Sequence, residues 1–366
     1  MEVLRIVILL ILSMLSATEA GPDPQVPCFF IFGDSLVDNG NNNGILTLAR
    51  ANYLPYGVDF PEGASGRFSN GRTTVDILAQ LLGFRNFIPS YSAVQRNEVL
   101  RGVNFASGAA GIRDETGNNL GEHYSFAEQI EHFRDVVQVI RRLFQRNETK
   151  LYDHLSKCIF FVGMGSNDYL NNYFMPNYYT TSSDFSPKTY SAVLLDDYSR
   201  LLNQLYDLGA RKVTVTGIGQ IGCIPYELAR LRAPKNKTGS RCNENINKAI
   251  NIFNAGLLQM VKRFNSAMED AKVIYLNTYE SSKDLTMNAI SYGFTVVDKG
   301  CCGVGRNNGQ ITCLPLQTPC SNRSSHLFWD AFHPTEAANQ IYAMKAYNST
   351  SASDVYPINL KQLAIA

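Results

Sequence analysis

Short, continuously apolar runs alternate along the chain with longer segments in which apolar residues recur every three or four positions. The first pattern is typical of strands buried on both faces, and the second of amphipathic helices. We expect strands at Cys28–Phe32, Leu100–Phe105, Ile159–Val162, Lys212–Thr216 and Lys272–Leu276. We expect helices at Thr73–Leu82, Phe126–Phe144, Tyr190–Leu208, Asn243–Met268 and Ala337–Ala346, the last with Pro334 as its start signal.

This alternation of strand and helix predicts an α/β protein. We expect a three-layer sandwich, with a central, mostly parallel sheet of about five strands and helices on both faces. No long stretch of Pro, Gly and Ser and no internal repeat divides the chain, so residues 21–366 are expected to form a single domain with insertions. In parallel sheets the chemistry lies on the loops that follow the strands, and those loops hold the candidate residues.

The first twenty residues have the pattern of a signal peptide. Arg5 precedes an apolar run from Ile6 to Leu15, and the small residues Thr18 and Ala20 follow it. The alternative is a membrane anchor, but a span needs about 20 apolar residues and this run has half that length. No later segment is long and apolar enough to cross a bilayer. We therefore expect residues 1–20 to be removed from a secreted, extracellular protein, with the cell wall among its destinations.

Cysteines and sequons agree with that compartment. The chain has eight cysteines, an even count that favours disulfides in a secreted protein, although the sequence leaves their pairing open. A zinc site is the alternative, but the usual Cys-x-x-Cys or Cys/His spacing is missing. Four Asn-x-Ser/Thr sequons are candidate glycan acceptors, at Asn147, Asn236, Asn322 and Asn348.

Charge and composition exclude two classes of protein. With 33 basic and 32 acidic residues, the formal net charge is +1. Nucleic-acid binding is not expected, since it calls for a basic patch or stripe. Disorder is not expected either, because 20 Phe and 19 Tyr residues supply apolar surface for a core.

Four loop segments carry groups that could take part in serine hydrolysis. Taken alone, each of them is better explained as an ordinary turn, loop or helix cap. A serine follows the first strand, a glycine loop the second, an asparagine the third, and an Asp-x-x-His pair stands near the C-terminus. The segments are Gly33-Asp34-Ser35-Leu36, Ser107-Gly108-Ala109-Ala110-Gly111, Gly165-Ser166-Asn167-Asp168 and Asp330-Ala331-Phe332-His333.

Together and in this order, the four segments resemble the four blocks of the GDSL-type SGNH hydrolases. The chain is most similar to plant GDSL esterase/lipases, with which it shares Phe-Gly-Asp-Ser-Leu-x-Asp-x-Gly at the start and Phe-Trp-Asp-x-x-His-Pro-Thr at the end. The resemblance implies an SGNH-hydrolase-like, flavodoxin-like fold. It also implies that Ser35 is the nucleophile, His333 the general base and Asp330 its orienting partner, with no metal or cofactor.

The same resemblance implies an oxyanion hole formed by the amide of Ser35 together with Gly108 and Asn167. Many relatives read Ser-Gly-Gly-Ala-Gly in the second block, where this chain has Ala109 in place of the second glycine. Which amide of the Gly108 loop donates is therefore left open.

The function expected from these features is that of a secreted serine ester hydrolase. Its substrates would be carboxylic esters, either acyl lipids or small molecules. One alternative is an acyltransferase or a carbohydrate deacetylase with the same triad. Another is a catalytically silent extracellular binding protein. The sequence indicates neither the natural ester nor the oligomeric state.

One motif points elsewhere. The segment Gly217-Ile218-Gly219-Gln220-Ile221-Gly222 follows a predicted strand and has the spacing of a dinucleotide-binding fingerprint. That fingerprint must open a helix, and Pro225 would break such a helix after about one turn. We expect a glycine-bent loop beside the site instead.

Overall fold

A five-stranded sheet lies at the centre of the computed structural model, which describes residues 23–231 and 242–366. The strand order is β1-β2-β3-β4-β7, with the first four strands parallel and the last antiparallel to β4. The strands are β1 (Phe29–Gly33), β2 (Ile159–Gly163), β3 (Lys212–Thr216), β4 (Lys272–Leu276) and β7 (Val355–Tyr356). The α/β class and the mostly parallel sheet are confirmed.

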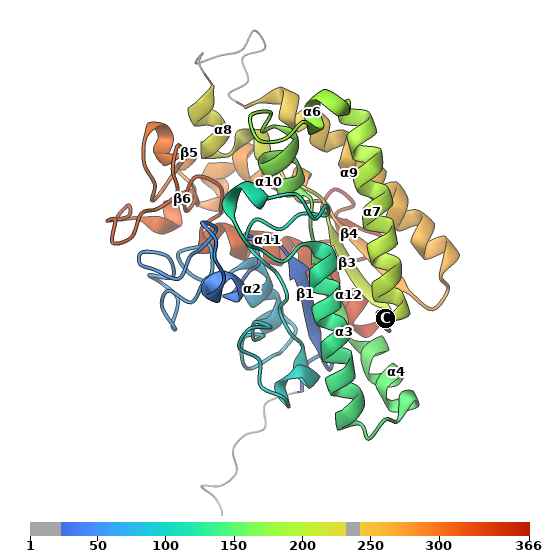
Figure 1. Ribbon diagram of the computed structural model, residues 1–366. Helices are drawn as coiled ribbons and strands as arrows, with labels where there is room; N and C mark the ends of the chain where they lie inside the picture. Colours follow the sequence, from blue (N-terminus) through green and yellow to red (C-terminus); the bar gives the residue numbers. More distant parts are fainter. Residues whose placement is uncertain (1–22, 232–241) are drawn as a thin grey trace, which may run out of the picture.

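Helices cover both faces of this sheet (Figure 1). Successive strand residues point to opposite faces, so Phe30 and Phe32 pack into one core and Phe29 and Ile31 into the other. The first core is closed by α3 (Phe126–Leu143), α7 (Pro187–Asp207) and α9 (Glu244–Ala267). The second core is closed by α2 (Thr74–Leu81), α11 (Glu336–Asn348) and α12 (Leu360–Ile365).

The remaining elements are shorter. A second sheet pairs β5 (Val296–Gly300) with β6 (His326–Phe328). The other α-helices are α4 (Glu148–Lys157), α5 (Ser166–Asp168), α6 (Thr181–Asp184), α8 (Pro225–Arg230) and α10 (Thr278–Met287). Tyr169–Tyr173 is π-helical. The 3-10 turns are Asn41–Gly44, Glu98–Arg101, Asn118–Leu120, Ile221–Cys223, Ala289–Tyr292, Arg306–Asn308 and Arg323–Ser325.

The helices and four of the strands expected from the sequence are present to within a few residues, but Leu100–Phe105 is not a strand. Its first residues belong to a 3-10 turn, and Gly102 has a φ of 117°, outside the range of a strand. Only Asn104 forms bridges, to Ile31 and to Ser90. The fifth strand is β7 instead, at the opposite edge of the sheet.

One proline acts differently from the expectation. Pro334 is not the first residue of α11, because Thr335 caps that helix by accepting a hydrogen bond from the Ala338 amide. The glycine motif ends in a 3-10 turn and opens no helix that continues through Pro225, as expected; Pro225 instead begins α8, where a missing N–H costs nothing.

All eight cysteines form disulfides, as the sequence indicated. The pairs are Cys28–Cys158, Cys223–Cys242, Cys301–Cys320 and Cys302–Cys313. Two clusters in the described residues have metal-like spacing, but each consists of one disulfide and one histidine. Metals bind the cysteine thiolate, which a disulfide does not offer.

The expected signal peptide, residues 1–20, and the sequon at Asn236 lie outside the described residues. Among the helices of residues 23–231 and 242–366, none combines the length and the apolar character needed to span a bilayer.

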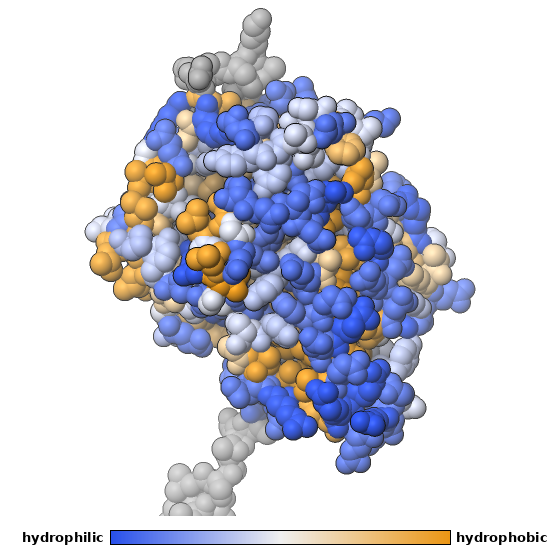
Figure 2. All heavy atoms as spheres, viewed as in Figure 1, coloured by the Kyte–Doolittle hydropathy of each residue, from blue (hydrophilic) through white to orange (hydrophobic). Residues whose placement is uncertain are grey.

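Figure 2 shows apolar residues gathered on the left of the view, where Figure 1 places β5 and β6, while the helices on the right present a mainly hydrophilic surface.

Candidate active site

Ser35 lies in a tight turn directly after β1. The carbonyl of Asp34 accepts hydrogen bonds from the amides of Val37 and Asp38, and its carboxylate accepts one from Leu36. Asp34 is buried, and burial raises the pKa of its carboxyl to about 6. Ser35 itself is only partly buried. The turn thus presents the serine hydroxyl to a cleft while its neighbour holds the backbone.

His333 and Asp330 lie on the loop between β6 and α11. The Asp330 carboxylate accepts hydrogen bonds from the amides of Phe332 (2.9 Å) and His333 (2.8 Å), which closes the loop on itself. The His333 carbonyl accepts from the Trp329 amide at 2.7 Å. The backbone therefore holds the imidazole and the carboxylate on the same side of one turn.

The loop places His333 between Ser35 and Asp330. His333 Nε2 lies 2.8 Å from Ser35 Oγ, and Nδ1 lies 2.9 Å from both carboxylate oxygens of Asp330. Burial alone would raise the pKa of the wholly buried Asp330. The charge and hydrogen bond of His333, with donors from Tyr56 and Phe332, outweigh burial and lower that pKa. The carboxylate is thus ionised at neutral pH.

Asn167 follows β2 and lies in the same cleft as Ser35. Its Nδ2 donates to the Ala110 carbonyl at 2.9 Å, and its Oδ1 accepts from Asn171 Nδ2 at 2.7 Å. An amide nitrogen carries two hydrogens, so these contacts orient the group and leave its second N–H for a ligand. Asn171 belongs to the π-helical turn, a feature frequent at functional sites.

Gly108 is close to these groups, but its amide is already engaged. Gly108 N donates to Asp38 Oδ2 at 2.9 Å, and its carbonyl accepts from Asn42. The next residue, Ala109, lines the cleft and has a φ of 72°, a left-handed conformation that favours glycine. This is the position at which the sequence departs from the Ser-Gly-Gly pattern.

Two buried carboxylates fix this loop. Asp38 binds the Gly108 amide, and Asp168 accepts from the amides of Ile112 (2.8 Å) and Arg113 (3.1 Å). Burial raises the pKa of both carboxyls to about 6, although the backbone donors pull it down. The loop after the expected second strand is therefore anchored to the loops that follow β1 and β2.

Comparison with known proteins assigns this chain to a family. Residues 29–346 match the model of the GDSL-like lipase/acylhydrolases. The chain is 57% identical to GDSL esterase/lipase At1g33811 of Arabidopsis thaliana over 371 residues, with both chains covered completely. It is 51% identical to At1g29670 of the same plant, over 98% of this chain and 97% of that protein. The chain belongs to the GDSL-like lipase/acylhydrolase family.

In this GDSL family member, Tyr56 is a site residue that the sequence did not reveal. Its hydroxyl donates to Asp330 Oδ2 at 2.5 Å, and its side chain is 1% exposed. Tyr56 and Asp330 are 274 positions apart in the chain, and no motif joins them. A buried tyrosine in a Pro-Tyr-Gly turn reads as ordinary packing.

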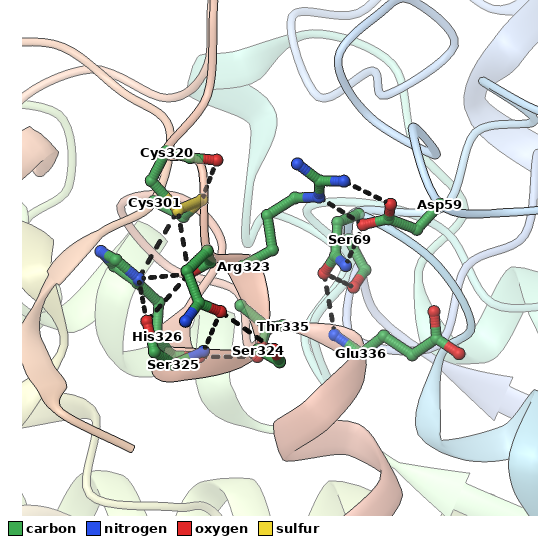
Figure 3. A network of polar contacts seen from close by, with 12 residues as sticks. Asp59, Ser69, Cys301, Cys320, Arg323, Ser324, Ser325, His326, Thr335 and Glu336 are labelled. Carbon is green, nitrogen blue, oxygen red and sulfur yellow. Dashed lines mark hydrogen bonds and ion pairs between the residues drawn. A yellow bond between two sulfur atoms is a disulfide. The ribbon is translucent and has the colours of Figure 1, made fainter. Parts of the chain in front are cut away.

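A polar network joins the loop that holds Asp59 and Asn70 to the segment from Arg323 to Glu336 (Figure 3). Arg323 donates to both carboxylate oxygens of Asp59 at 2.5 and 2.7 Å. The Glu336 amide, at the start of α11, donates to Asn70 Oδ1 at 2.9 Å. The N-terminal loops are thus fixed to the segment that carries Asp330 and His333.

The cleft above the GDSL serine has a volume of about 1280 Å³, open solvent included. Ser35, Ala109, Asn167 and His333 line it together. Its outer part contains polar side chains, among them Arg50, Asn119 and Gln310, and the exposed apolar residues Leu48 and Ile311. Ser35, His333 and Asn167 line one cleft, and Asp330 contacts His333 from the side away from Ser35. Gly108 does not line the cleft but adjoins it through Ala109.

Proposed function

We propose that this protein hydrolyses carboxylic esters through an acyl-enzyme on Ser35. The observation that carries the proposal is the unbroken chain of hydrogen-bonding atoms from Ser35 Oγ to His333 Nε2 and from His333 Nδ1 to Asp330. A serine hydroxyl is a weak nucleophile that needs such an adjacent base. The GDSL esterase/lipase names of its relatives support the same class of reaction.

In this mechanism, His333 takes the proton of Ser35 as Oγ attacks the ester carbonyl. Asp330 holds the imidazole with Nδ1–H toward the carboxylate and stabilises the imidazolium. The protonated His333 then gives its proton to the leaving alcohol. Water, deprotonated by His333, hydrolyses the acyl-enzyme and restores the serine.

The oxyanion formed in each step needs preorganised donors. We assign this role to the Ser35 amide, to the second N–H of Asn167 and to the Gly108 loop. Because the Gly108 amide is engaged by Asp38, the amide of Ala109 is the better candidate within that loop. Asn167 is held for the task by Asn171 and Ala110.

The proposal includes secretion after removal of residues 1–20, with residues 21–366 as one catalytic domain. Four disulfides support an oxidising compartment. Asn147, Asn322 and Asn348 are exposed and suit glycan attachment, although Asn147 also caps α4.

The test is hydrolysis of p-nitrophenyl esters by the purified protein and by Ser35→Ala and His333→Ala. We expect both substitutions to lower kcat by about 10⁴-fold or more, as triad removal does in other serine hydrolases. Thermal unfolding of each variant verifies that it is folded. Turnover retained by a folded Ser35→Ala protein would exclude the serine mechanism.

A further inference from the structure

A second cavity, of about 1120 Å³ with open solvent included, adjoins the catalytic cleft. It lies beyond the ends of β2, β3 and β4 and reaches α10 and α11. Five residues line both hollows: Leu36, Ser166, Ile221, Ile224 and Phe332. Leu36 directly follows Ser35 in the chain, and Phe332 directly precedes His333. The two hollows therefore adjoin each other beside the groups proposed to react.

The wall of the second cavity is mainly apolar. Leu36, Phe161, Met164, Ile218, Leu276 and Phe332 contribute to it. Ser35 and His333 line only the cleft. An ester held at Ser35 therefore lies in the cleft, and Leu36 and Phe332 stand between the cleft and this cavity.

Residues 217–221 of the glycine motif form one side of the cavity. Its amides are engaged by the protein: Ile218 N donates to Asn254, Gln220 N to Ser282 and Gly222 N to Asn247. A phosphate-binding loop directs its amides at the ligand, which this loop does not do. Only at Gly217 and Gly219 does it present the cavity with backbone that carries no side chain.

We propose that the second cavity binds the acyl chain of the ester and that Gly219 sets the depth available to it. This inference rests on the proposed ester hydrolysis. The acyl chain stays bonded to Ser35 after the alcohol leaves, and burial of its methylenes at the mainly apolar wall stabilises that intermediate. The alcohol arm lies in the cleft, where Arg50, Asn119 and Gln310 suit a polar group.

Gly219 is the position at which a side chain would fill the cavity without disturbing the fold. A Cβ there would lie 3.5 Å from Ser282 Oγ and 3.6 Å from Thr278 Cγ2, both ordinary contacts with residues of the same wall. Gly217 offers no such room, since its Cβ would lie 2.4 Å from the Tyr275 hydroxyl. A larger residue at 219 therefore extends into the space proposed for the chain.

The experiment measures kcat/KM of Gly219→Leu on two ester series. The first keeps p-nitrophenol and lengthens the acid from acetate through butanoate and octanoate to dodecanoate. The second keeps the acetyl group and lengthens the alcohol from butyl to octyl. Each methylene transferred out of water is worth about fourfold in binding, so we expect losses of about tenfold or more for octanoate and dodecanoate. Acetate and the whole alcohol series should change less than about twofold.

Gly44→Leu is the matched control. Gly44 is exposed, its Cβ would meet no atom within 4 Å, and it lines neither hollow. This variant should keep the wild-type profile in both series. Gly219→Ala, with one added carbon, should fall between wild type and Gly219→Leu on the long acids, and it replaces Gly219→Leu if that variant is unfolded.

The possible results distinguish a failure of the acyl-chain inference from a failure of the proposed ester hydrolysis. A wild-type protein that hydrolyses no ester in either series would overturn both. A wild-type protein that is active while Gly219→Leu lowers all acids equally, or shortens the preferred alcohol, would overturn the acyl assignment alone.

Discussion

The hydroxyl of Tyr56 donates to Oδ2 of Asp330 and so helps to hold the carboxylate that His333 contacts. Tyr56→Phe removes a donor to Oδ2 while the contacts to Oδ1 remain. A hydrogen bond to a charged group is worth about 1.5–3 kcal/mol, which corresponds to about ten- to 100-fold in rate, and we expect kcat for p-nitrophenyl acetate to fall within that range. The pKa of Asp330 should rise, so that activity disappears at a higher pH on the acid side.

Tyr53→Phe is the control for Tyr56→Phe. The Tyr53 hydroxyl donates not to Asp330 but to the Cys313 carbonyl at 2.9 Å. Its loss should leave the acid limb of the pH profile in place. A Tyr56→Phe protein with a wild-type profile would show that the tyrosine only packs.

The motifs pointed to the side chains that we propose react, but not to the groups that hold them. Ser35, Asp330 and His333 stand in local patterns whose chemistry can be recognised one segment at a time. Tyr56 joins Asp330 only through the fold. The engagement of the Gly108 amide by Asp38 is likewise a tertiary contact, 70 positions apart in the chain, and it moves the proposed donor to Ala109.

The start of α2 depends on a buried ion pair. Arg67 contacts both carboxylate oxygens of Asp76 at 2.7 and 2.8 Å, and the same carboxylate caps the helix through Thr73. The Arg67 guanidinium also stacks on Phe60, 4.1 Å from the ring centre. Breaking a buried pair from one side leaves an unpaired charge, at a cost of about 3–5 kcal/mol. We expect Arg67→Met to lower the free energy of unfolding by that amount in guanidinium titrations.

Arg72→Met tests whether burial of the Arg67–Asp76 pair is the reason for the large expected loss of stability. Arg72 pairs with Glu336, but both side chains are partly exposed, and such pairs contribute about 1 kcal/mol or less. Equal losses for Arg67→Met and Arg72→Met would contradict the account given for α2.

Helices and strands with a clear periodic pattern of apolar residues could be predicted from the sequence. Elements that form only through contacts with distant parts of the chain could not. The apolar spacing of Phe126–Leu143 and Glu244–Ala267 matches one buried face, so both helices could be placed within a residue or two. β7 has two residues and exists because β4 offers an open edge. In the opposite case, the apolar run at Leu100–Phe105 reads as a strand, but Gly102 interrupts it. The two backbone hydrogen bonds to Ile31 are made by Val103 and Phe105, which follow that glycine.

At the scale of the whole molecule, the register of the parallel sheet brings Cys28 and Cys158 together. Phe29 pairs with Ile159 in the register of β1 and β2, and Cys28 and Cys158 each lie one residue earlier. The sequence predicted disulfides but left their pairing open, because pairing depends on that register. The resulting link joins the starts of the two strands that carry Ser35 and Asn167 at their other ends.

This disulfide should contribute more to stability than a short-range one. Cys28–Cys158 has a sequence separation of 130, against 11 for Cys302–Cys313, and all four cysteines are buried. In the chain-entropy model these loops correspond to about 5 and about 3 kcal/mol. We expect Cys28→Ala/Cys158→Ala to lose about 2 kcal/mol more free energy of unfolding than Cys302→Ala/Cys313→Ala in guanidinium titrations. Because burial is matched, a larger loss from the short loop would mean that local packing around Cys302, and not restriction of the unfolded chain, governs the effect.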